Sequence, residues 1–94
     1  MITKIAVATT ATLVSDSRER NWLMIQNQSD TPIFLSFDGT AGVTIDSGAT
    51  PGIRLAPYET VLSADIGGRF TGNNFPIYAI HGGTGTKNLV IQES

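Results

Sequence analysis

Apolar side chains recur at every second position along most of the chain, which is the period of a β-strand and not of a helix. Over residues 4–13, Ile5 and Val7 share one face with Leu13, while small or polar side chains occupy the other. This segment predicts one long half-buried strand, or two strands separated near Thr9. Helical spacing does not extend over ten residues anywhere in the sequence.

Residues 20–38, RNWLMIQNQSDTPIFLSFD, predict two strands around a polar turn. Paired as a hairpin, these strands place leucine and isoleucine side chains on one face, where they form a core. Met24 then faces Phe34 on the opposite face, with Trp22 one step along the strand. Both faces of this hairpin therefore carry large apolar groups, although a small domain covers only one of them with its own core.

Glycine-rich loops and short alternating segments make up the rest of the chain. Loop 38–52 contains a short candidate strand, and four further strands follow it, the last two as a hairpin; the ranges are 43–45, 53–56, 60–64, 77–81 and 88–92. About eight or nine short strands, with turn signals roughly every 8–12 residues, predict an all-β fold. We expect a small antiparallel β-sandwich or a jelly-roll-like barrel.

Ninety-four residues predict a single domain, with an N-terminal strand or arm at 1–19 and a β-sandwich body at 20–94. The sequence has no cysteine, so neither a disulfide nor a thiolate metal site strengthens its small core, and self-association is the remaining way to do so. Net charge is −2 and the six lysines and arginines do not cluster, which predicts no nucleic-acid partner. No apolar run approaches the roughly 18 residues of a membrane helix, which predicts no membrane partner.

The sequence offers few groups that carry chemistry. His81 has no partner at a spacing typical of a general base or of a metal site, so we expect a hydrogen-bonded or solvent-facing side chain at a strand end. The segment GGTGTK at 82–87 precedes Asn88 and a strand, whereas a phosphate-binding loop needs a Ser or Thr and a helix there. We interpret it as a turn in which glycine takes a positive φ.

Turn chemistry explains the other polar candidates. We interpret two aspartates beside the glycine loop as turn formers and not as calcium ligands: Asp38 and Asp46. Asn27-Gln28-Ser29 matches a glycosylation sequon, and we interpret it as a turn in which Asn and Ser bond their own backbone. We interpret Arg18 and Arg20 as solvated surface residues. The alternative is that one of them pairs with a carboxylate, such as Asp65 or Glu59. Together these residues predict no catalytic group, cofactor or metal, and hence a protein that is not an enzyme.

The strongest functional signal is the cluster of three large apolar side chains on one face of the predicted hairpin: Trp22, Met24 and Phe34. Monomers seldom expose such a group, so it predicts an interface with another subunit or partner. The alternative is that the second sheet or loop 38–52 covers it within one subunit. The N-terminal strand, with Ile5 and Val7, is a second interface candidate, as a mobile arm that pairs with a neighbour's sheet edge.

Four segments follow one another along the chain. They are NWLMIQN preceded by an arginine, then SDTPIFLSF, GIRLAPYET and FPIYAIHGGTGTKNLVIQE. In this order, from Arg20 to about Glu93, the chain resembles a group of small bacteriophage virion proteins with β-sandwich or jelly-roll folds. Such proteins decorate or cement capsids, or are minor head or tail components, often as trimers.

The resemblance implies a structural protein, made in the host cytoplasm and located on the capsid surface of the virion. Its expected partners are further copies of itself, with a trimer favoured, and the major capsid protein. The resemblance implies no catalytic residue. The alternative function is a carbohydrate- or receptor-binding domain of a phage tail or fibre, for which the candidate contacts are Tyr58, Tyr78, Asn73 and Asn74.

Overall fold

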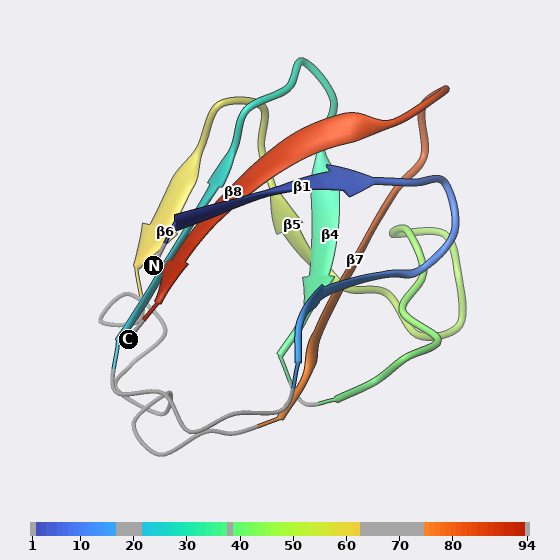
Figure 1. The fold of residues 1–94 in the computed structure, drawn as a ribbon. Coiled ribbons are helices and arrows are strands. Elements are labelled where there is room, and N and C mark those ends of the chain that lie inside the picture. The colour runs from blue at the N-terminus through green and yellow to red at the C-terminus, as the bar shows by residue number, and fades with distance from the viewer. Residues whose placement is uncertain (1, 17–21, 38, 63–74, 94) are drawn as a thin grey trace.

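A computed structural model describes residues 2–16, 22–37, 39–62 and 75–93, which form eight strands in two antiparallel sheets (Figure 1). The strands are β1 Ile2–Val7, β2 Thr12–Ser15, β3 Leu23–Asn27, β4 Ile33–Ser36, β5 Ile53–Leu55, β6 Thr60–Leu62, β7 Ile77–His81 and β8 Lys87–Glu93. Within these ranges there is no helix, and hence none long and apolar enough to cross a membrane. The predicted all-β sandwich is confirmed.

Consecutive strands mostly lie in different sheets. Sheet A has the order β1-β8-β3-β6 and sheet B the order β2-β7-β4-β5, so that β4 and β5 are the one sequential pair within a sheet. The chain crosses repeatedly between the two four-stranded sheets. These strand orders are those of a jelly roll, which consists of two Greek keys. Each sheet ends in two edge strands, β1 and β6 in sheet A and β2 and β5 in sheet B.

The predicted hairpin of residues 20–38 is wrong, because β3 belongs to sheet A and β4 to sheet B. Met24 lies opposite Gln92 and Leu62, whereas Phe34 lies opposite Ile80 and Arg54. The polar turn between the two strands crosses from one sheet to the other.

The predicted C-terminal hairpin is wrong for the same reason, since β7 pairs with β2 and β4 while β8 pairs with β1 and β3. A strand that joins either sheet needs its apolar side chains on the face toward the core. Alternation therefore specifies the buried face of each strand but not the strand that lies next to it.

The inner faces of the two sheets meet in one core. Leu23 and Ile25 of β3 face Ile33 and Leu35 of β4 across the sandwich, and all four side chains are buried. The sequence-based assignment of these residues to the core is confirmed, although they belong to facing sheets and not to one hairpin.

The N-terminal segment is part of both sheets. Its break at residues 8–11 confirms the alternative of two strands, with β1 along β8 and β2 along β7. Val7 is fully buried in the core, and Ile5 packs against the same cluster.

A buried asparagine organises the turn after β3. The Asn27 side-chain amide donates to the carbonyl oxygens of Thr31, Leu55 and Ala56, at 2.8, 3.1 and 3.2 Å. Its Oδ1 accepts from the backbone N–H and the hydroxyl of Ser29, at 3.0 and 2.7 Å. The interpretation of Asn27-Gln28-Ser29 as a hydrogen-bonded turn is confirmed.

His81 organises the turn between β7 and β8. Its Nδ1 accepts from the backbone N–H of Gly83 at 3.1 Å, and its Nε2 lies 2.8 Å from the carbonyl oxygen of Gly85. A carbonyl only accepts, so these partners assign the proton to Nε2. His81 is hydrogen-bonded as expected but is buried and does not face solvent, and Gly85 takes the predicted positive φ, +67°.

The loop before β5 packs beside sheet B. Residues 43–45 form no strand of their own, and Thr44 instead makes an isolated bridge with Pro51. A Cβ on Gly52 would lie 2.8 Å from the Leu35 nitrogen and 2.7 Å from a methyl group of Val43, which is itself buried. The loop therefore lies against β4 with no room for a side chain at position 52.

Candidate interaction surface

One row of side chains crosses all four strands on the outer face of sheet A. In strand order from β1 to β6 it holds Ile2, Gln92, Met24 and Leu62. Ile2 and Leu62 are 66% and 36% exposed, and Met24 is half-buried. Trp22, two residues before Met24, is 38% exposed. We call Ile2, Met24, Leu62 and Trp22 the sheet A patch.

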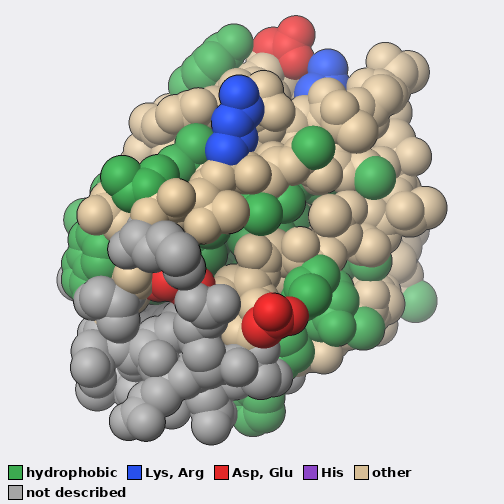
Figure 2. Space-filling model, viewed as in Figure 1, with side chains coloured by type: hydrophobic (Ala, Val, Ile, Leu, Met, Phe, Trp, Pro, Cys, Tyr) green, Lys and Arg blue, Asp and Glu red, His purple; other side chains and the backbone are tan. Residues whose placement is uncertain are grey.

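The surroundings of the sheet A patch carry little charge. The next row across this face holds Lys4, Val90, Gln26 and Thr60, followed by Ala6 and Asn88. Of the residues that the strands of sheet A place on this face, Lys4 alone is charged. Figure 2 shows hydrophobic side chains gathered on the β6 side of the sandwich and few charged groups in the same view. Apolar character with depleted charge is typical of the centre of a protein interface.

The structure separates the interface residues predicted from the sequence. Trp22 and Met24 lie on the outer side of sheet A, whereas Phe34 belongs to sheet B and is 6% exposed. Ile5 and Val7 face the chain's own core. The three-residue cluster does not form, because it depended on the hairpin of residues 20–38.

Sequence reasoning missed two members of the sheet A patch, Ile2 and Leu62. Ile2 and Lys4 are two positions apart in the first strand, so their side chains point to the same face. The pattern of this strand therefore indicated that the Ile2 side chain points outward. Leu62 joins the patch because β6 pairs with β3, and no local pattern in the sequence specifies that pairing.

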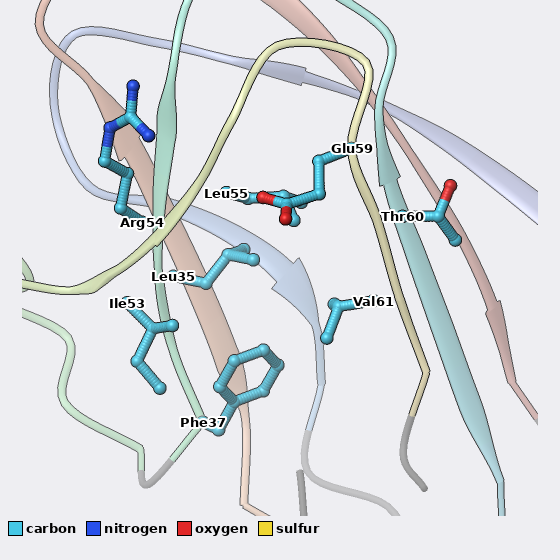
Figure 3. Close-up of a pocket in the computed structure, with 8 residues that line it drawn as sticks. All are labelled: Leu35, Phe37, Ile53, Arg54, Leu55, Glu59, Thr60 and Val61. Carbon is cyan, nitrogen blue, oxygen red and sulfur yellow. The ribbon is translucent and has the colours of Figure 1, made fainter. Parts of the chain in front are cut away.

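A crevice of about 300 Å³ opens between the edge strands β5 and β6, where the two sheets leave the core uncovered (Figure 3). Its lining residues are Leu35, Phe37, Ile53, Arg54, Leu55, Glu59, Thr60 and Val61. In Figure 3 the Phe37, Ile53 and Val61 side chains converge, and the Arg54 guanidinium points away from them. The volume is near the lower limit for ligand sites, and the lining is mostly apolar.

The charged groups of this crevice differ in their surroundings. Glu59 is exposed, and its Oε1 accepts from the backbone N–H of Ala56 at 2.7 Å, which closes the turn between β5 and β6. Arg54 shares the outer face of sheet B with Phe34. The candidate arginine partners of Glu59, and the carboxylate of Asp65, lie outside the described residues.

A second hollow, of about 240 Å³, lies beside a buried carboxylate. The Ser15 hydroxyl on β2 lies 2.9 and 3.1 Å from the two carboxylate oxygens of Glu93 on β8. This contact links sheet B to sheet A, and both side chains are buried. The buried position of Glu93 was not predicted from the sequence.

The remaining candidates do not assemble into a site. Across the described ranges, no three His, Cys, Asp or Glu side chains are grouped so as to hold a metal ion. Asp46 is exposed, and Asp38 lies outside those ranges.

The candidate carbohydrate contacts are dispersed. Tyr58 is exposed in the turn after β5, whose last residue pairs with the first residue of β4. Tyr78 is half-buried and pairs with Ser36 at the other end of β4. The two tyrosines therefore lie toward opposite ends of sheet B, while Asn73 and Asn74 are outside the described residues.

Comparisons of the chain with protein-family models, with curated proteins and with solved structures found no match.

Proposed function

We propose that this protein is a non-enzymatic structural virion protein that self-associates, with a trimer favoured, and decorates or cements a bacteriophage capsid. The observation that carries this proposal is the sheet A patch, an exposed apolar surface in a nearly uncharged sheet face. Placement on the capsid, against the major capsid protein, is supported by the resemblance of residues 20–93 to small phage virion proteins.

Leaving the apolar side chains of the sheet A patch in water is unfavourable. Burial of apolar surface contributes about 25 cal/mol per Å², and a contact of roughly 800 Å² per partner is ordinary for a stable complex. Side chains on paired strands are already held in place, so their burial in such a contact needs no rearrangement of the backbone. A jelly roll is compatible with this role, since it occurs in capsid and lectin domains, but the fold alone does not select a function.

The test is to place a charge within the sheet A patch. We expect Met24→Glu to weaken association of the purified chain, and its binding to assembled capsids, by about tenfold or more, because a carboxylate must lose its hydration on burial. Sedimentation velocity at micromolar concentration measures the first effect, and co-sedimentation with capsids the second.

Ala49→Glu is the matched control. Ala49 is exposed on the loop before β5, outside the sheet A patch, so this variant is expected to associate like the wild type. The proposal would be contradicted if the wild-type chain sediments as a folded monomer and does not bind capsids. Binding on a glycan array in place of capsid binding would support the receptor-binding alternative.

A further inference from the structure

The two edges of sheet A differ in a way that allows them to fit each other in neighbouring copies. At one edge, β1 presents Ile2 and Lys4, two positions apart on the outer side of the strand. At the opposite edge, β6 and the adjacent β5 enclose the apolar crevice with Glu59 at its rim. One edge therefore projects an apolar group and a cation, and the other offers an apolar hollow and a carboxylate.

We propose that the β1 edge of one copy docks into the β5–β6 crevice of the next, with Ile2 against the apolar wall and the Lys4 ammonium beside the Glu59 carboxylate. The occupant of the crevice is thus a second copy of this chain, which contributes two residues to it. The inference rests on the proposed self-association and adds an edge contact to the sheet A patch, with which it shares Ile2.

Apolar complementarity is the first support. Ile2 is 66% exposed at the β1 edge, and Ile53 is 60% exposed in the crevice. Docking would remove both side chains from water together and complete the cover over Phe37 and Val61, which line the same hollow. A single chain leaves these groups at two separate edges.

Charge complementarity is the second support. Among the described residues, the Lys4 ammonium makes no ion pair, and the carboxylate of Glu59 accepts only from a backbone N–H. In Figure 3 the Arg54 guanidinium lies apart from the Glu59 carboxylate, so it does not occupy the place assigned to Lys4. Residues two apart on one face of a strand are separated by about 7 Å, so Ile2 and Lys4 reach different parts of the crevice.

The geometry also bears on the size of the assembly. A contact between two different surfaces is heterologous, and it closes into a ring when the rotation between copies permits. A trimer is one such ring, whereas a two-fold dimer would bring identical surfaces together.

Charge reversal tests the contact. We expect Lys4→Glu, and separately Glu59→Lys, to raise the dissociation constant of the self-assembled chain about tenfold or more, because each places like charges together. The double variant Lys4→Glu/Glu59→Lys is expected to return to within about threefold of the wild type, since the pair is restored in reverse. Sedimentation velocity of the full chain over a concentration series measures all four proteins.

Two controls isolate the charge effect. Asp46→Lys makes the same reversal as Glu59→Lys on an exposed loop outside both surfaces, and it should leave association unchanged. Glu59→Gln removes the charge while its amide oxygen still accepts from Ala56, so any loss of association reflects the ion pair and not the turn.

Single reversals that associate as tightly as the wild type would overturn the inference, as would a double variant no tighter than the singles. If Met24→Glu still weakens assembly or capsid binding in that case, the proposed function stands and only the docking mode fails. A wild-type chain that is monomeric and does not bind capsids would refute both the docking mode and the proposed function.

Discussion

The side-chain amide of Asn27 on β3 donates a 3.1 Å hydrogen bond to the carbonyl oxygen of Leu55 on β5, and so joins sheet A to sheet B. The same amide also binds carbonyls of Thr31 and Ala56, which belong to two other connections. Buried backbone carbonyls require donors. One fully buried side chain therefore satisfies carbonyls from two segments, at residue 31 and at residues 55–56, that alternation alone does not bring together.

Asn27→Ala is expected to lower the free energy of unfolding by about 2–4 kcal/mol, because it leaves several backbone groups without partners. Urea unfolding followed by tryptophan fluorescence measures the change. Gln28→Ala, at the exposed neighbouring position, should stay within about 0.5 kcal/mol of the wild type. Equal effects of the two substitutions would show that Asn27 does not join the sheets.

Gly52 supplies a second stability prediction. A Cβ there would meet the Leu35 nitrogen and oxygen at 2.8 and 2.9 Å, and backbone atoms cannot move aside as a flexible side chain can. We expect Gly52→Ala to destabilise the fold by about 1–3 kcal/mol through overpacking. Gly42→Ala is the control, since nothing lies within 4 Å of its Cβ position, and thermal unfolding compares the two. Similar melting temperatures for both variants would refute the close approach of the loop to β4.

Alternation in the sequence predicted much of the core, although it placed Leu13 on the buried face of the first segment, whereas Leu13 is 44% exposed and Val14 is buried. Leu23, Ile25, Ile33 and Leu35 are buried as expected, since each strand must turn its apolar face inward whichever sheet it joins. The strand boundaries could also be predicted from nearby residues, because proline, glycine and polar turn residues mark them.

Strand pairing could not be predicted from the same pattern. A short polar turn such as residues 28–32 connects either two strands of a hairpin or two facing sheets, and both arrangements require the same alternation. The sheet A patch depends on β8 and β3 lying between β1 and β6, which is a long-range relationship. Ile2 and Leu62 are far from Met24 in the sequence, so the predicted cluster placed Met24 beside Phe34 instead.

Asp30 provides a pH-dependent prediction. The Thr31 hydroxyl, followed by the Lys87 ammonium at 3.4 Å, lowers the pKa of the Asp30 carboxyl from its ordinary value of 3.8. A carboxyl with a lowered folded-state pKa stabilises the fold above about pH 4, and this contribution is lost as the pH falls through the folded value. The urea midpoint of Asp30→Asn should therefore lie slightly below that of the wild type near pH 7, and the difference should shrink as the pH falls through the folded-state pKa.

Salt provides the control for Asp30. The pair is exposed, so about 1 M salt should shrink the difference at pH 7 by screening the Lys87 charge. In a Lys87→Gln background, Asp30→Asn should likewise change the urea midpoint at pH 7 by less than it does in the wild type. A difference that persists unchanged near pH 2 would mean that the ionised carboxyl is not its source.

Phe34 distinguishes folding from assembly. It lies on the outer side of sheet B but is 6% exposed within a single chain, so its burial needs no second copy. We expect Phe34→Ala to lower the free energy of unfolding by about 3–4 kcal/mol through loss of packing. Association of the folded fraction should remain that of the wild type, whereas Met24→Glu should show the reverse.

Phe34→Leu keeps the comparison valid if the alanine variant fails to fold, because it removes less volume while leaving the site apolar. Unfolding is measured at a concentration where the wild type is dissociated, since assembly itself raises apparent stability. Sedimentation is then measured at a temperature where every variant is folded. If folded Phe34→Leu dissociates as readily as Met24→Glu, then the outer side of sheet B carries the assembly contact and the sheet A patch does not.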